Sequence, residues 1–149
     1  MSDLIGFLRK KQDEDRTRPA IVAKIKKGWL DSIHKLYSEI DEWLAEEQDE
    51  GLIKITEEET AISEERLGTY KAPVLILKAG TNVVKLLPIG KTIIGADGRI
   101  DMKSDKGFAF MFLYLQPEGC WVHGHGPRPK DFSKLTKARF EELLKKSLE

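Results

Sequence analysis

The feature that most constrains this fold is a long run of apolar residues at helical spacing. The stripe recurs at intervals of three, four, seven, four and three residues and consists of Val22, Ile25, Trp29, Leu36, Ile40 and Trp43, with Ile33 and Leu44 widening it. Such spacing places the side chains on one face of a helix. Thr17 and Pro19 suit its start and Gly51 suits its end. The pattern predicts a helix of about 29 residues, roughly 43 Å long.

A shorter helix is expected before this one. Ser2 can cap its N-terminus, and the apolar residues Leu4, Ile5, Phe7 and Leu8 precede a polar run from Arg9 to Arg18. We expect only its first two turns to be buried.

After Gly51 the apolar period changes from 3.6 to 2, which indicates strands. The predicted strands are 52–56, 60–63, 74–77, 83–87, 92–94, 99–103 and 108–115. Turn-forming residues connect them, for example Asp97-Gly98 and Gln116-Pro117-Glu118-Gly119. Strands joined by such short turns pair antiparallel. Residues 108–115 are apolar at every position, so we expect a central strand with the long helix on one face and the C-terminal helix or a second sheet on the other.

The expected fold is therefore α+β, with N-terminal helices, one of them long, packed on an antiparallel β meander that a C-terminal helix closes. We expect one domain over 1–149, with a helical region at 1–50, the meander at 52–126 and the last helix at 132–147. The 149-residue length is sufficient for a single core. A single cysteine, Cys120, and no apolar run long enough to cross a bilayer favour a cytoplasmic protein without a membrane partner.

Charge is distributed unevenly along a chain whose net charge is zero. Residues 1–28 carry eight Lys/Arg against four Asp/Glu, residues 29–67 carry three against thirteen, and residues 68–149 carry fourteen against eight. The neutral total and the lack of RNA-recognition or zinc-finger signatures argue against nucleic-acid binding. No dinucleotide or P-loop motif is present, so no cofactor is expected.

Metal-ligating residue types gather at Cys120, His123 and His125. Thiolate and imidazole bind zinc well, and the two histidines share a face if the segment is extended. Cys120 would then point to the other face, and no further ligand follows at a familiar spacing. The favoured interpretation is that Cys120 is a small core residue and that the histidines lie in a surface loop.

A second candidate pattern is Asp101-x-Lys103, which matches half of a metal-dependent nuclease motif. The alternative is that Asp97-Gly98 forms a turn and that Arg99, Asp101 and Lys103 form the solvent face of a strand.

Without a convincing catalytic constellation, the sequence favours a non-enzymatic interaction or regulatory module, cytoplasmic and prokaryotic, over an enzyme. Trp29 and Trp43 lie fourteen residues apart, two heptads, and so share a helix face. The hypothesis is self-association, or binding of a protein partner, through a seam of Trp29, Leu36, Ile40 and Trp43. The alternative hypothesis is a metal-dependent hydrolase or nuclease that uses His123, His125 and Asp101.

Overall fold

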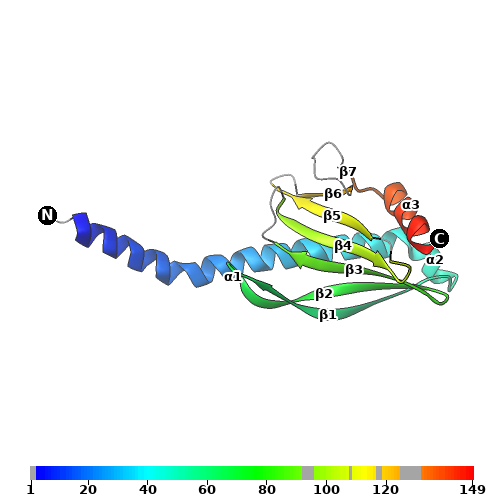
Figure 1. Ribbon diagram of the computed structural model, residues 1–149, viewed down its shortest axis with the longest axis horizontal. Coiled ribbons are helices and arrows are strands. Elements are labelled where there is room, and N and C mark those ends of the chain that lie inside the picture. Colours follow the sequence, from blue (N-terminus) through cyan, green and yellow to red (C-terminus); the bar gives the residue numbers. More distant parts are fainter. Residues whose placement is uncertain (1–2, 92–95, 108, 117–118, 125–131) are drawn as a thin grey trace.

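The computed structural model describes residues 3–91, 96–107, 109–116, 119–124 and 132–149. The helices are α1 (Asp3–Trp43), α2 (Ala45–Asp49) and α3 (Lys137–Leu148). The strands are β1 (Lys54–Glu64), β2 (Gly68–Ala79), β3 (Asn82–Gly90), β4 (Gly98–Ser104), β5 (Ala109–Leu115), β6 (Cys120–Gly124) and β7 (Ser133–Lys134). The predicted α+β fold, with a long N-terminal helix, an antiparallel meander and a C-terminal helix, is confirmed (Figure 1).

Helix α1 differs from the prediction because it is continuous. The two predicted helices form one helix of 41 residues that includes Pro19. A proline inside a helix loses one backbone hydrogen bond but does not have to end the helix. At its C-terminal end α1 stops at Trp43, earlier than predicted, and Gly51 adopts a φ of +72° only after the short helix α2.

The described strands form a single sheet whose order follows the sequence, β1 to β7, with every neighbouring pair antiparallel. Residues 52–56 and 60–63 were expected to be separate strands. Instead, an unbroken register from Lys54 opposite Lys78 to Glu64 opposite Gly68 joins them into β1. The three glutamates between the two apolar segments are tolerated because they are exposed on a strand that pairs on one side only. The predicted strand at 92–94 lies outside the described residues.

The C-terminal end of the sheet also differs from the prediction. His123 was expected to lie in a surface loop, but residues 120–124 form β6 and pair with β5, with Phe112 opposite His123. Ser133 and Lys134, expected to begin the last helix, form β7 beside β6. Helix α3 starts later because Thr136 is its N-cap and accepts a hydrogen bond from the backbone N–H of Arg139 at 3.2 Å.

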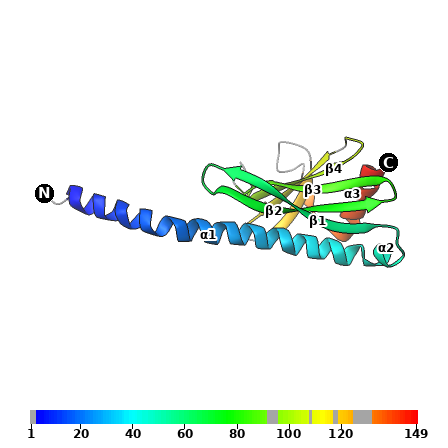
Figure 2. The ribbon, with the colours of Figure 1, turned by 90° about the horizontal axis from the view of Figure 1, so that it is seen from below.

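The core lies between one face of the sheet and the C-terminal half of α1, where Trp29, Ile33, Leu36 and Ile40 are at most 1% exposed. Figure 2 shows this half of α1 running along the sheet while its N-terminal half continues beyond it. Helix α3, or a second sheet, was expected on the face of the sheet opposite the long helix, and for α3 this prediction is wrong. It covers the same face as α1, because Phe140 packs against both Trp43 (5.7 Å between ring centroids) and Phe112 (6.5 Å).

Among the described residues, no helix is both long enough and apolar enough to span a lipid bilayer.

Candidate partner-binding surface on the projecting helix

The N-terminal half of α1, residues 3–25, extends away from the sheet and is called the arm below (Figure 1). Its apolar side chains are exposed: Leu4 65%, Ile5 54%, Phe7 58%, Leu8 53%, Ile21 55% and Ile25 40%. The first two turns were expected to be buried, and this prediction is wrong. The apolar patch is present, but the described part of the chain supplies nothing to cover it.

The arm is fixed to the rest of the protein at Trp29, just beyond its base. The Trp29 indole Nε1 donates to the Tyr70 hydroxyl at 3.1 Å, and that hydroxyl donates to the Glu64 carboxylate. Burial, assisted by Glu64, raises the pKa of Tyr70, so this hydroxyl stays protonated and remains a donor. The indole ring also packs on Trp121 at 6.0 Å. These contacts define the direction in which the arm leaves the sheet.

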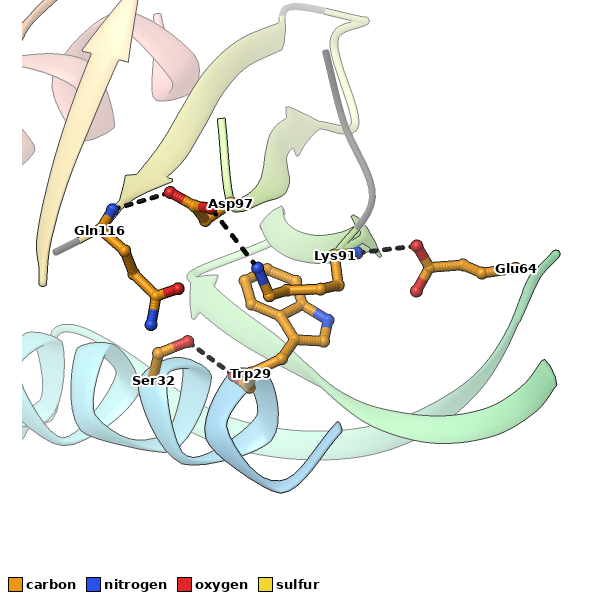
Figure 3. Close-up of polar contacts among 6 residues, drawn as sticks. All are labelled: Trp29, Ser32, Glu64, Lys91, Asp97 and Gln116. Atoms are coloured by element: carbon orange, nitrogen blue, oxygen red, sulfur yellow. Dashed lines mark hydrogen bonds and ion pairs between the residues drawn. The ribbon is translucent and has the colours of Figure 1, made fainter. Parts of the chain in front are cut away.

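The neighbouring polar contacts join this point to two further segments (Figure 3). The backbone N–H of Lys91 donates to Glu64 Oε1 at 3.0 Å, and Lys91 Nζ lies 3.7 Å from Asp97 Oδ1. The other Asp97 oxygen accepts from the backbone N–H of Gln116 at 2.8 Å. Asp97, expected to be a turn residue only, therefore ties the ends of β3, β4 and β5 together beside the arm.

Gly98 is required at this place because of Trp29. A Cβ built on Gly98 would lie 2.1 Å from Cζ3 of the Trp29 ring, closer than any real contact. The indole thus lies flat against bare backbone of β4. The sequence interpretation of Gly98 as a hairpin glycine missed this reason for its presence.

A groove of about 940 Å³ lies between the arm and the end of the sheet. The arm contributes Glu14, Thr17, Arg18, Ile21, Val22 and Ile25, and the sheet side contributes Glu65, Arg66, Leu67, Lys91, Ala96 and Asp97. Both sides of the groove therefore combine apolar and charged side chains, and Ile21, Val22 and Ile25 form the apolar part of the arm side. Its location continues the exposed apolar surface of the arm toward the folded part of the protein.

The predicted seam lies further along α1 and is covered by the chain itself. Trp29, Leu36 and Ile40 are 1%, 1% and 0% exposed, and Trp43 is partly buried against Phe140. The regular apolar spacing was read correctly as one face, but the sheet occupies that face. A partner that contacts the apolar face of α1 in this structure must use the arm.

The predicted metal candidates do not converge. His123 lies on the inner face of β6, where it faces α3. Its Nε2 has no hydrogen-bond partner among the described residues, and burial together with Arg139 lowers its pKa. Cys120 lies three residues away on the opposite face, and His125 lies outside the described residues. No group of three His, Cys, Asp or Glu side chains within the described ranges is arranged to hold a metal ion.

Asp101 does not join His123 either. Asp101 is opposite Met111, which is opposite Gly124, so Asp101 shares a face with Gly124 and not with the adjacent His123. Asp101 is 8% exposed, and its carboxylate accepts two hydrogen bonds from Arg99, at 2.8 and 3.1 Å. The expectation of a solvent face holds for Lys103, but Asp101 is a buried ion-pair partner. The residues of the alternative hydrolase hypothesis are thus divided between two faces of the sheet.

Comparisons with protein-family models, with curated proteins and with solved structures found no match to this chain.

Proposed function

We propose that this chain is a non-enzymatic interaction module whose arm binds a protein partner, either a second copy or another protein. The observation that carries the proposal is the exposure of six large apolar side chains on one projecting helix. Contiguous apolar patches on a protein surface mark interaction sites far more often than isolated apolar residues do. The proposed partner-binding surface is therefore residues 4–25 of α1. It replaces the seam of the sequence hypothesis, which consisted of Trp29, Leu36, Ile40 and Trp43.

Helix energetics support a partner for the arm. A helix in water gains most of its stability from packing of its apolar face, and segments of about 12 to 15 residues are marginal alone. The arm contains Pro19, and a proline inside a helix costs about 3 kcal/mol. It also contains Gly6, whose Cα has open space around it, and glycine costs about 1 kcal/mol relative to alanine. A covering partner would offset these costs.

The sheet edge is a poorer binding surface than the arm. β1 pairs only with β2 among the described strands, and its free edge carries the exposed residues Glu57, Glu58 and Glu59. Charged side chains on an edge strand disfavour pairing with another chain. This contrast favours helix packing over strand addition as the mode of association.

A photoactivatable cross-linking residue in place of Phe7, in cells that produce the full chain, tests the proposal. We expect a discrete covalent adduct from position 7. Leu4→Glu in the same chain should abolish the adduct, because it places a charge in the apolar patch. The matched control carries the cross-linker in place of Arg16, an exposed position beside the apolar stripe rather than in it.

The mass of the adduct identifies the partner class. An adduct of two copies indicates self-association, and an adduct with another polypeptide indicates a different partner. Equal labelling from positions 7 and 16, or no adduct from position 7, would contradict the proposed function.

A further inference from the structure

The arm continues the heptad spacing of α1, but its central positions are charged. Intervals of four and three residues connect Leu4, Leu8, Lys11, Asp15, Arg18, Val22 and Ile25. Two apolar ends thus flank a charged centre on one helix face. Residues spaced in this way form the seam of a two-helix coiled coil.

We propose that two copies of this chain pair their arms antiparallel, with Leu4 of each copy facing Val22 of the other. This inference rests on the proposed function and specifies its partner as a second copy. In this register Lys11 faces Asp15 of the other copy, twice per dimer. Leu8 meets the aliphatic stem of Arg18, which keeps its charge at the edge of the seam.

The charge pattern selects the antiparallel orientation. Parallel arms in register would place Lys11, Asp15 and Arg18 each against its own counterpart, giving three consecutive like-charge contacts. Like charges in contact destabilise an interface, whereas complementary pairs fix orientation and register. In the antiparallel pair Glu14 faces Glu14 of the second copy at the centre, where a Lys11 lies within a helical turn of each carboxylate.

The groove fits the incoming helix end. Phe7 and Ile21 each come one residue before a seam residue, Leu8 and Val22, so they have the same heptad position beside the seam. Such positions face each other in antiparallel packing, which places Phe7 against Ile21 of the second copy. Ile21 and Val22 both line the groove of about 940 Å³. The first turns of the second arm, which are apolar, would therefore enter the groove beside Leu67 and replace solvent there.

A charge exchange tests the register. Lys11→Asp and Asp15→Lys should each weaken dimerisation at least about tenfold, because each creates two like-charge contacts. The double variant should regain most of the wild-type affinity. Asp13→Lys is the matched control, since Asp13 lies on the opposite side of the arm. Sedimentation equilibrium gives the dissociation constants, and all of these side chains are exposed in the single chain, so its fold should be unaffected.

Introduced thiols test the orientation. With Cys120→Ser as background, a mixture of Leu4→Cys and Val22→Cys chains should form a disulfide-linked dimer in air. Each variant alone should not, because equivalent positions would be separated by about 27 Å along the helices.

The outcomes separate the two proposals. A wild-type chain that stays monomeric up to millimolar concentration overturns the antiparallel dimer, and the adduct from position 7 then decides the proposed function independently. If Leu4→Cys alone cross-links as well as the mixture does, the antiparallel orientation is wrong. If the double charge variant shows no recovery, the register is wrong. In both cases self-association through the arm still stands.

Discussion

The two halves of α1 share one heptad register, and their apolar residues have opposite surroundings. From Trp29 to Ile40 the apolar face is buried against the sheet, with Ile33 and Ile40 fully covered. From Leu4 to Ile25 the apolar side chains are exposed, except that Val22 is partly buried at the groove. Periodicity specifies which side of a helix is apolar, but it does not specify what covers that side. This difference is the basis of the proposal that another molecule covers the arm.

The largest contrast should appear between two aromatic truncations. Trp29→Ala should lower the free energy of unfolding by about 3 to 5 kcal/mol, because it empties a buried site. Phe7→Ala should change it by less than about 0.5 kcal/mol at concentrations where the protein is monomeric. Urea unfolding followed by circular dichroism measures both. A large loss in Phe7→Ala would mean that the arm folds onto its own chain.

A pair of glycine substitutions should differ in sign. Gly98→Ala should destabilise by about 1 to 3 kcal/mol, because its methyl group collides with the Trp29 ring. Gly6→Ala has open space on the arm and should raise helicity by up to about 1 kcal/mol in helix propensity. Far-UV circular dichroism and urea unfolding distinguish them. If Gly98→Ala were neutral, Trp29 would not lie against β4.

Two hydroxyl deletions compare buried and exposed hydrogen bonds. Tyr70→Phe removes the bond to Glu64 at the base of the arm and should cost about 1.5 to 3 kcal/mol. Thr17→Val removes an exposed bond of 3.1 Å to the Asp13 carbonyl and should cost less than about 0.5 kcal/mol. Similar losses for both would contradict the role of Tyr70 as an anchor.

The same anchor predicts alkaline sensitivity. The pKa of Tyr70 is raised in the folded chain, so its contribution to stability is complete below the unfolded value of about 10 and is lost as pH rises above it. Wild type should therefore lose stability above pH 10 more steeply than Tyr70→Phe. Parallel curves for the two proteins would show that Tyr70 makes no such contribution.

The smallest expected effect concerns His123, which lies far from the arm. Burial and Arg139 lower its pKa below 6.5. Its contribution to stability is present above that value and is lost as pH falls through the lowered pKa. An NMR titration should show a pKa below 6.5, and Arg139→Gln should raise it. A pKa above 6.5 would place His123 outside the space under α3.

The sequence allowed the fold class to be predicted because its two periods, 3.6 and 2, are strong over long stretches. It failed where local signals compete with tertiary pairing. Glu57 to Glu59 interrupt the apolar alternation of β1, so β1 was predicted as two strands. Gly124 and the prolines that follow it favoured a loop in place of β6. Both segments are strands because they form ladder hydrogen bonds with neighbouring strands.

The candidate site was harder to predict than the fold. The sequence identified residues 4–8 as an apolar patch, but the prediction that this patch is buried failed. Burial depends on whether another element reaches the patch, which the sequence does not specify. The base of the arm could not be foreseen either, because Trp29 is distant in sequence from Tyr70 and Glu64 and meets Tyr70 only when α1 packs beside the β1–β2 hairpin. The charged residues Lys11, Asp15 and Arg18 at heptad positions were the sequence signal that distinguishes the arm from the uniformly apolar face that packs on the sheet.

Amide hydrogen exchange at high and low protein concentration tests the central claim most directly, because it reads both halves of α1 in one experiment. Amides of residues 29–43 should be protected at both concentrations. Those of residues 4–25 should be protected only at the concentration where the arm is paired, since an uncovered helix opens readily. Arm amides that exchange freely at every concentration, with no partner added, would contradict the self-pairing, and arm amides protected equally at all concentrations would contradict the need for any partner.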